Sequence, residues 1–298
     1  MFFQEIINGI VVGTSYALLA LGFSIIYGVL RLINFAQLSL FTLGAYFGLF
    51  IESYLIKILP NNGWFDFLLT VIMAGVLTGV FGIIVALIAW WPIRRAPIIS
   101  MVVSSLAILI LLESLIENIV SPEPLVVNVS IHNSIFSFFG AQFSLLELIS
   151  LIISVVLTTM FYLVIRKTKI GRAIRAVASN SDSAAVLGVN VSVTVIIMFA
   201  ISALLAGVSG VLVSNTYGVV SFNMGEVIGL KGFTAAVLGG MGDLWGSVVG
   251  GLVLGVIESL STFILPSQWT PAVAFAILIL VLAIRPTGIL SSKSVDRA

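Results

Sequence analysis

Residues 65–91 read FDFLLTVIMAGVLTGVFGIIVALIAWW, and Asp66 is the only charged residue in this run. The run exceeds the roughly 20 apolar residues that an α-helix needs to cross about 30 Å of hydrocarbon. Its apolar residues are continuous rather than alternating, which favours a helix over a barrel strand, because a spanning segment must satisfy its own backbone hydrogen bonds. This stretch predicts a transmembrane helix and indicates the fold class of the whole chain.

Similar apolar runs recur from one end of the chain to the other. They occupy residues 6–30, 38–59, 98–120, 145–165, 193–217, 227–239, 244–265 and 272–284. The run at 227–239 is too short and interrupted to cross alone, so we expect a broken or re-entrant segment near residues 227–243. The sequence therefore predicts an all-α polytopic membrane protein, with about eight transmembrane helices in a single domain over residues 1–298.

The composition of the 298-residue chain supports the same class. Hydrophobic residues make up 60% of it and charged residues 8%, whereas a soluble domain carries about 25% charged residues. A soluble enzyme and a disordered chain are therefore excluded. The net charge of +1 argues against a nucleic-acid partner, which would need clustered Lys and Arg. With no Cys and one His, the usual zinc sites are excluded, and we expect neither a metal nor a cofactor.

Positive charge indicates which loops face the cytoplasm. Residues 166–192 hold five of the thirteen cationic residues, namely Arg166, Lys167, Lys169, Arg172 and Arg175. Cytoplasmic loops carry an excess of Lys and Arg, so we expect residues 166–192 to be cytoplasmic. Residues 121–144 contain neither Lys nor Arg and are expected to form an extracytoplasmic loop.

A weak internal repeat aligns Asn34-Phe-Ala-Gln-Leu38 with Gly240-Met-Gly-Asp-Leu244. Each copy places a polar or glycine-containing break just before a helix with small residues. Paired interruptions in two halves indicate a substrate path in transporters, because freed backbone groups must line a cavity or pack on protein. The match has few identities, and chance similarity is the alternative.

Other polar residues lie in or near the apolar runs. Glu258 lies near the middle of its run, where an ionisable group is costly and therefore a functional candidate. Glu226 and Lys231 are expected in the outer headgroup region. Together with the two breaks, these observations define candidate path residues that we expect to face a polar cavity at a subunit interface. They are Asn34, Gln37, Thr234, Gly239, Gly240, Gly242 and Glu258.

The basic loop carries a second pattern between residues 171 and 188. Most of its residues are good helix formers, and Asn180-Ser-Asp182 either interrupts the helix or caps a second short one. Gly188 is placed to end it. One interpretation is an amphipathic helix lying on anionic lipid. The side formed by Ala173, Ala176 and Ala184, followed by a terminal glycine, is more typical of a docking knob for a partner protein.

Several segments are shared with a known family. They are Tyr16-Ala-Leu-Leu-Ala-Leu-Gly22, Ile33-Asn-Phe-Ala36, Leu43-Gly-Ala-Tyr46, Gly171-Arg-Ala-Ile-Arg-Ala176, Leu187-Gly188, Phe233-Thr-Ala-Ala-Val-Leu-Gly-Gly-Met-Gly242, Gly246 and Gly250-Gly-Leu-Val-Leu-Gly255. On these segments the sequence resembles the LivH-type permeases of bacterial ABC importers for branched-chain amino acids, over nearly the whole chain. It departs from the family at one place, where Gln37 and Leu38 replace a common His-Gly pair, and this puts a role for that His in doubt.

The resemblance implies a permease subunit of a bacterial inner membrane that works by alternating access. It implies a second, LivM-like permease subunit, two ATP-binding subunits on the cytoplasmic side and an extracytoplasmic substrate-binding protein. The implied cargo is leucine, isoleucine or valine, although close relatives also move urea and short amides. By analogy, a coupling helix would fit the ATPase; its residues would be Gly171, Arg172, Ala173, Arg175, Ala176, Ala184, Leu187 and Gly188.

Two other classes of function compete with this interpretation. A self-sufficient secondary transporter or channel for a small polar solute would use the basic loop only as a topology signal, and its uptake would need no partner ATPase. A membrane-embedded enzyme is disfavoured, because the chain has no P-loop sequence and its single His leaves no Ser/His/Asp set. We expect no catalytic residue, so that partner subunits would hydrolyse ATP.

Overall fold

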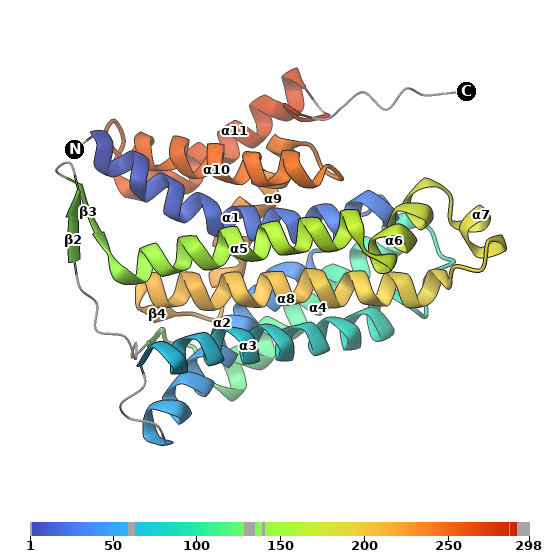
Figure 1. Ribbon diagram of the computed structural model, residues 1–298, viewed down its shortest axis with the longest axis horizontal. Helices are drawn as coiled ribbons and strands as arrows, with labels where there is room; N and C mark the ends of the chain where they lie inside the picture. The colour runs from blue at the N-terminus through green and yellow to red at the C-terminus, as the bar shows by residue number, and fades with distance from the viewer. Residues whose placement is uncertain (1, 59–62, 128–134, 139–140, 286, 291–298) are drawn as a thin grey trace.

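The structure is a computed structural model that describes residues 2–58, 63–127, 135–138, 141–285 and 287–290 (Figure 1). Its longest helices run along the long axis of the molecule. The helices long and apolar enough to cross a membrane are α1 (Phe2–Leu30), α2 (Ala36–Ile58), α3 (Gly63–Val85) continued by the π-helical turn η1 (Ala86–Trp90), α4 (Ile98–Ile119), α5 (Leu145–Lys167), α8 (Val191–Tyr217) and α10 (Leu244–Ser261).

The remaining elements are shorter. They are α6 (Lys169–Ser179), α7 (Ser181–Val186), the π-helical turn η2 (Gly225–Gly229), α9 (Leu230–Gly239), the 3₁₀ turn η3 (Ser267–Trp269) and α11 (Thr270–Ile284). Two small antiparallel pairs complete the described part of the chain: β1 (Leu125–Val126) with β4 (Val219–Val220), and β2 (Ile135–Phe138) with β3 (Ala141–Ser144).

The prediction of an all-α polytopic membrane protein is confirmed. The described residues contain seven candidate spans, and α11 is a further apolar helix of 15 residues, in agreement with about eight helices. The expected break near residues 227–243 is also present. There, η2 and the ten-residue α9 precede a non-helical turn at 240–243, so this segment has no single long helix.

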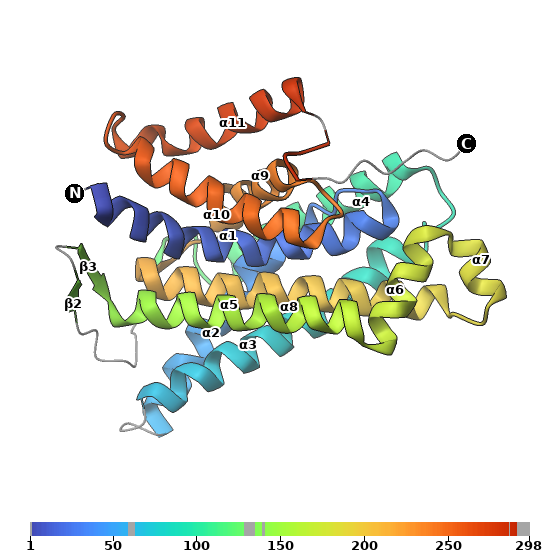
Figure 2. The ribbon, with the colours of Figure 1, turned by 45° about the horizontal axis from the view of Figure 1, so that its top comes forward.

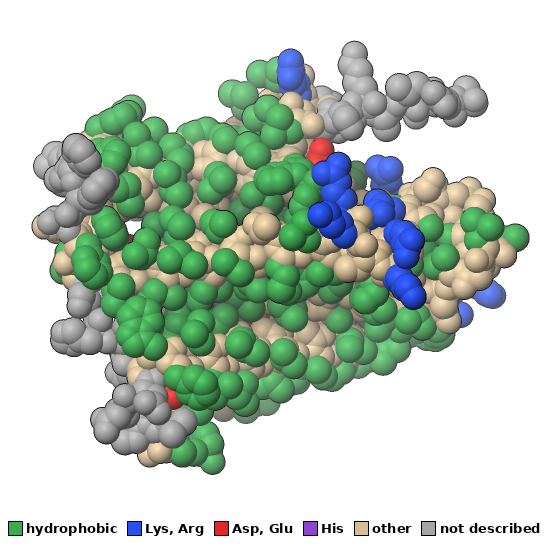
Figure 3. Space-filling model, viewed as in Figure 1, with side chains coloured by type: hydrophobic (Ala, Val, Ile, Leu, Met, Phe, Trp, Pro, Cys, Tyr) green, Lys and Arg blue, Asp and Glu red, His purple; other side chains and the backbone are tan. Residues whose placement is uncertain are grey.

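The two ends of the molecule differ in charge. Lys and Arg side chains gather beside α6 and α7, while the face between the two ends is largely hydrophobic (Figures 1 and 3). We call this the basic end; its cationic residues include Arg94, Arg95, Arg166, Lys167, Lys169, Arg172 and Arg175. The hairpin of β2 and β3 lies at the opposite end (Figure 1). This separation is the pattern that the excess of positive charge on one side of a membrane predicts.

Helix α1 lies at the centre of the bundle. Its most apolar stretch is 89% buried, whereas those of α4 and α5 are only 17% and 22% buried. α10 crosses α1 along much of its length, with α5 and α8 also in contact (Figure 2). The peripheral helices therefore carry most of the exposed apolar surface.

Glycines set the distance between α1 and α10. A Cβ at Gly9 would lie 2.6 Å from the Cα of Val256, and one at Gly13 would lie 2.9 Å from the Cα of Leu252. On the facing helix, a side chain at Gly255 would collide with the carbonyl oxygen of Gly9. Small residues at helix interfaces allow this close approach in lipid, where no hydrophobic force draws helices together.

Candidate functional site

The two predicted breaks are linked through α9 and α1. The first occupies residues 31–35 before α2, and the second occupies residues 240–243 before α10. Phe233 of α9 connects them to α1: its ring centroid lies 6.4 Å from that of Phe35 and 5.7 Å from that of Phe23. Gly242 of the second break packs on α1, with its amide donating to Ser24 Oγ at 3.3 Å. Residues about 200 positions apart thus form one seam against α1.

Gln37, at the start of α2, is buried between α1 and α8. Its Nε2 donates to the Ser202 carbonyl oxygen at 3.1 Å, and its Oε1 contacts the Ser202 hydroxyl. That hydroxyl also lies 2.9 Å from the Gly22 carbonyl oxygen. A side chain at Gly22 would collide with the amide of Gln37. The start of α2 is therefore held between the middle of α1 and the middle of α8.

Asn34 also belongs to the seam and is 3% exposed. Its Nδ2 has no hydrogen-bond partner among the described residues. A buried amide without a partner is costly. Asn34 is thus a place where a small rearrangement of the first break would gain a hydrogen bond.

The other candidate path residues lie along α9 and the second break. Thr234 and Gly239 are fully enclosed, and the Thr234 hydroxyl donates to the Leu230 carbonyl oxygen at 2.9 Å. Gly240 and Gly242 have φ values of +104° and +94°, which explains why glycine occupies both positions of this turn. Of these four residues, only Gly242 lines one of the cavities described below.

Glu258 forms a buried ion pair with Lys231. The Lys231 ammonium donates to Glu258 Oε1, and the two side chains are 10% and 9% exposed. The ammonium also lies 5.9 Å from the centroid of the Tyr16 ring. The position of Lys231 near the start of its run suggested an exposed site in the headgroup region. That prediction is wrong, because Lys231 is buried. The chain places it in the interior because α9 packs beside α10.

The candidate coupling residues form a two-helix hairpin at the basic end. Thr168 Oγ1 caps α6 by accepting from the Gly171 amide at 3.2 Å, and Asn180 Oδ1 caps α7 by accepting from the Ser183 amide at 2.9 Å. Gly188, with φ +87°, ends α7. The predicted helix, its interruption at Asn180 and its end at Gly188 are all confirmed.

Burial divides the coupling residues into two groups. Gly171 packs so closely on the end of α5 that a side chain there would collide with the Ile165 carbonyl oxygen, and Ala184 is 2% exposed. Ala173 and Ala176 are half-buried, while Arg172 and Arg175 are exposed. The outermost apolar side chains are Val186 and Leu187, which are 88% and 82% exposed. Val186 was not among the predicted coupling residues, because in the sequence it looks like any apolar residue of a helix.

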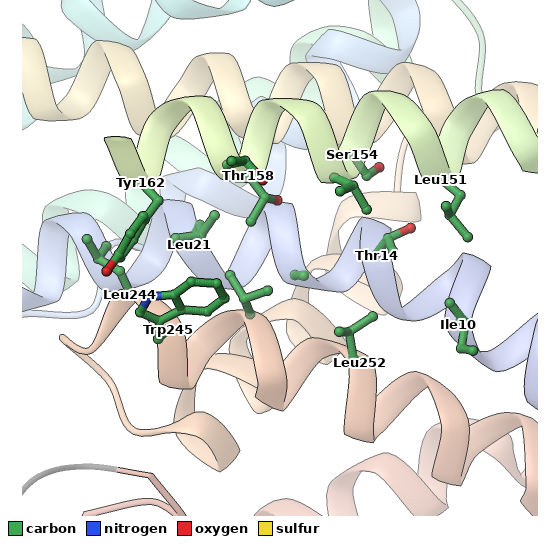
Figure 4. Close-up of a pocket in the computed structure, with 14 residues that line it drawn as sticks. Ile10, Thr14, Leu21, Leu151, Ser154, Thr158, Tyr162, Leu244, Trp245 and Leu252 are labelled. Carbon is green, nitrogen blue, oxygen red and sulfur yellow. The ribbon is translucent and has the colours of Figure 1, made fainter. Parts of the chain in front are cut away.

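Three cavities adjoin these elements. A mostly apolar cavity of about 310 Å³ lies between α1, α5 and α10, with Tyr162 and Trp245 near one end and Ile10 and Leu151 near the other (Figure 4). A cavity of about 500 Å³ continues it toward the basic end. The third, of about 750 Å³, lies among the ends of α1, α4, α6, α7 and α8, and Arg94 and Arg95 line it.

The described residues offer no group of three or more His, Asp or Glu side chains that could hold a metal ion. The chemistry that these sites support is hydrogen bonding, ion pairing and apolar contact. Such interactions suit binding and conformational change.

Comparison with known proteins identifies the family. Residues 5–282 match the family described as "Branched-chain amino acid transport system / permease component". The chain is 32% identical to the high-affinity branched-chain amino acid transport system permease protein LivH of Escherichia coli (strain K12), over 99% of this chain and 97% of that protein. It is also 32% identical to BraD of Pseudomonas aeruginosa, a permease protein of the same description, over 99% of this chain and 98% of that protein.

The similarity extends beyond bacteria. A probable branched-chain amino acid transport permease protein LivH of Methanocaldococcus jannaschii is 30% identical over 95% of this chain and 90% of that protein. No solved structure matches the chain. These relatives are transport permeases rather than enzymes. With its apolar helices and this full-length similarity, the chain is a multi-pass membrane protein that belongs to the family of permease components of branched-chain amino acid transport systems.

Proposed function

We propose that this chain is the membrane-spanning permease subunit of an ATP-driven importer of branched-chain amino acids in a bacterial cytoplasmic membrane. Its partners are a second, LivM-like permease subunit, two ATP-binding subunits and an extracytoplasmic substrate-binding protein. The cargo follows from the names of the relatives, which match the chain over nearly its full length. The single structural observation that supports an external motor is the capped hairpin of α6 and α7 at the basic end.

The apolar tip of this hairpin is suited to bind a protein in the cytoplasm. Val186, the last residue of α7, and Leu187, which follows it, are almost fully exposed. Burying such apolar side chains against a partner removes them from water and is favourable. Arg172 and Arg175 are exposed on α6 of the same hairpin. Val186 and Leu187 are thus exposed where a partner protein could contact them. Gly171 and Ala184 are buried and serve packing: Gly171 lies against the end of α5.

The hairpin is also firmly attached to the spans. Thr168 Oγ1 donates to the Val164 carbonyl oxygen at 2.6 Å, and Arg175 Nη1 donates to the Ile165 carbonyl oxygen. At the other end of the hairpin, Asn190 Oδ1 accepts from the Val193 amide at 3.1 Å and caps α8. A displacement of α7 by an ATPase would therefore move the ends of α5 and α8 rather than bend a loose loop.

We assign the translocation path to the seam between the two breaks. Backbone groups freed at breaks inside a membrane must be satisfied by protein or by water in a cavity. In this structure Thr234 and Gly239 are enclosed on α9, and Gln37 is buried between α1 and α8. Alternating access requires that the seam open in another state, with Asn34 and Glu258 then available to a polar solute. Recognition of the free amino acid belongs mainly to the binding protein.

The hairpin assignment is tested by changing its tip. Replacing Val186 and Leu187 with Asp should abolish recruitment of the purified ATP-binding subunits to membranes that contain the permease pair, and should abolish ATP-dependent uptake. Val126→Asp is the control, because Val126 is 70% exposed at the opposite end, and it should leave recruitment unchanged. Recruitment and uptake that survive both tip substitutions would overturn the assignment. Uptake that needs no ATPase would instead identify a secondary transporter or channel.

A further inference from the structure

The cavity between α1, α5 and α10 runs along the central part of α1 and of α5. Eleven residues separate Ile10 from Leu21 on α1, and the same number separates Leu151 from Tyr162 on α5. At 1.5 Å per residue both distances are about 16 Å, roughly half of the 30 Å hydrocarbon core. Figure 4 shows these side chains on α1 and α5, with Trp245 and Leu252 of α10 opposite them, around the cavity. The cavity crosses the middle of both helices, and its length suits part of an extended acyl chain.

The groove is apolar and narrow. Leu, Val, Ile and Ala side chains supply most of its wall. The Thr14 hydroxyl donates a hydrogen bond to the Val11 carbonyl oxygen at 2.7 Å. The cavity has a volume of about 310 Å³. An extended hydrocarbon chain is the occupant that this narrow apolar space suits.

The end of the groove nearest α6 is amphipathic. The rings of Tyr162 and Trp245 lie 4.9 Å apart between their centroids, and these two residues with Leu244 also line the neighbouring cavity of about 500 Å³. Tyr and Trp with one apolar and one polar side concentrate at the headgroup level of membranes. The aromatic pair therefore indicates where the hydrocarbon ends and the headgroup layer begins.

Positive charge lies directly beyond the aromatic pair. The Arg166 guanidinium lies 5.4 Å from the Tyr162 ring centroid and donates to the Tyr162 hydroxyl. Arg166 and Arg175 both line the second cavity, where Asp243 is the acidic residue. The Asp243 Oδ1 already accepts from the amides of Trp245 and Gly246, at 3.0 and 3.3 Å, so it caps α10. The cavity keeps a net positive charge, which complements a phosphate.

We propose that this groove is a binding site for one anionic phospholipid. One acyl chain of the lipid lies between α1, α5 and α10, and the phosphate of the lipid headgroup is held beside Arg166 at the basic end. The site joins the beginning of α10, directly after the second break, to the end of α5, directly before the hairpin. A lipid there would contact both moving parts of the transporter. The proposal rests on the groove and its charges and stands whether or not the chain carries amino acids.

Lipid retention by the full chain, purified with its partner subunits from membranes that contain phosphatidylglycerol, tests the site. Native mass spectrometry should find one phosphatidylglycerol per chain. Arg166→Gln and Val155→Phe, which alter the headgroup and acyl ends respectively, should each lower that retained fraction at least five-fold. Arg166→Lys, which keeps the charge, should retain the lipid. The double variant should lose little more than either single variant, because both ends bind the same molecule.

Matched controls separate this site from general effects at the membrane surface. Arg94 lies 4.0 Å from the Trp91 ring centroid at the same end of the protein, so Arg94→Gln removes an equivalent charge away from the groove. Val156 is 57% exposed on α5 beside Val155, which is 49% exposed and lines the groove. Arg94→Gln and Val156→Phe should both retain the lipid, with melting temperatures close to those of the groove variants.

Each contrary result would overturn the proposal. Retention that survives Arg166→Gln would show that the headgroup is not held there. Retention that survives Val155→Phe, or competition by inorganic phosphate, would indicate a phosphate site without an acyl chain. Equal exchange with phosphatidylcholine would exclude selection by charge. Release of a partner subunit by Val155→Phe would assign the groove to a protein interface.

Discussion

Lys231 of α9 and Glu258 of α10 form an ion pair that joins the short broken helix to a full-length one, with both side chains about nine-tenths buried. Charges at this depth are expensive to desolvate, and the attraction between them offsets that cost only when both are present. The pair therefore fixes where α9 sits along α10.

Removing one partner of this pair should destabilise the protein strongly. Glu258→Gln or Lys231→Met should lower the free energy of unfolding by about 3–5 kcal/mol, because the remaining charge stays buried without its partner. Thermal unfolding of the purified chain measures this, with the exposed carboxylate variant Glu123→Gln as the control. A melting temperature of Glu258→Gln equal to that of the control would contradict the assignment.

The apolar double variant Lys231→Leu/Glu258→Leu separates packing from transport. It should recover most of the lost stability, because apolar residues of similar size often replace a buried ion pair without loss. If the pair belongs to the path, uptake should stay abolished in this stable variant while the ATP-binding subunits still bind. Full uptake would assign the pair to packing alone.

The close approach of α1 and α10 should make glycine positions on α1 unequal. Gly9→Ala places a Cβ 2.6 Å from the Cα of Val256, a backbone atom that cannot move away alone, and should cost about 1–3 kcal/mol. Gly28→Ala on the same helix meets its nearest atom, the Cα of Gly242, at 3.4 Å and should cost much less. Thermal unfolding of both variants checks the difference, and equal melting temperatures would refute this packing argument.

Gln37 and Ser202 should behave as a coupled pair. Gln37→Leu removes both contacts with Ser202 and should cost about 1–3 kcal/mol, because buried polar groups lose their partners. The double variant with Ser202→Ala should cost less than the sum of the two single changes. Ser39→Ala is the control, since the Ser39 hydroxyl bonds only to the Ala36 carbonyl oxygen of its own helix at 3.0 Å. Strict additivity of the unfolding free energies would show that the pair is not coupled.

Gly188 should be needed for its backbone conformation rather than for space. Its φ is +87° and a Cβ there would meet nothing within 4 Å, so Gly188→Ala should cost about 1–2 kcal/mol of local stability. Amide hydrogen exchange in α7 should become faster, and Gly188→Asn should cost less. Gly218 has φ +71° and equally open surroundings at the far end of α8. Gly218→Ala should leave amide exchange in α7 unchanged. If α7 exchanged at the same rate in Gly188→Ala as in Gly218→Ala, the prediction would be wrong.

Most of the fold could be predicted from the sequence because a membrane span is a local property. The run at 65–91 has the length and hydropathy of a span without reference to any other residue, and the structure has a helix there. The interruption before α10 and the caps at Asn180 and Gly188 were predictable for the same reason. Each depends on residues within a few positions of one another.

The candidate sites depended more on contacts between distant segments. Gln37 was identified as a break residue, but its contact with Ser202 depends on how α2 and α8 pack. Ala184 lies on α7 and Leu187 directly follows its last residue, and packing buries the first and leaves the second exposed. The exposure of Val186 followed from the same packing and had no separate signal in the sequence.

By itself, then, the sequence determined the number and approximate ends of the helices, the position of the break and the concentration of cationic residues in one loop. Only the tertiary structure decided that Lys231 pairs with Glu258 and that α1, α5 and α10 enclose an apolar groove. The physical reason is the distance along the chain over which each interaction acts. Hydropathy and capping act over one or two helical turns, whereas burial and charge pairing depend on which helices the glycine faces bring into contact.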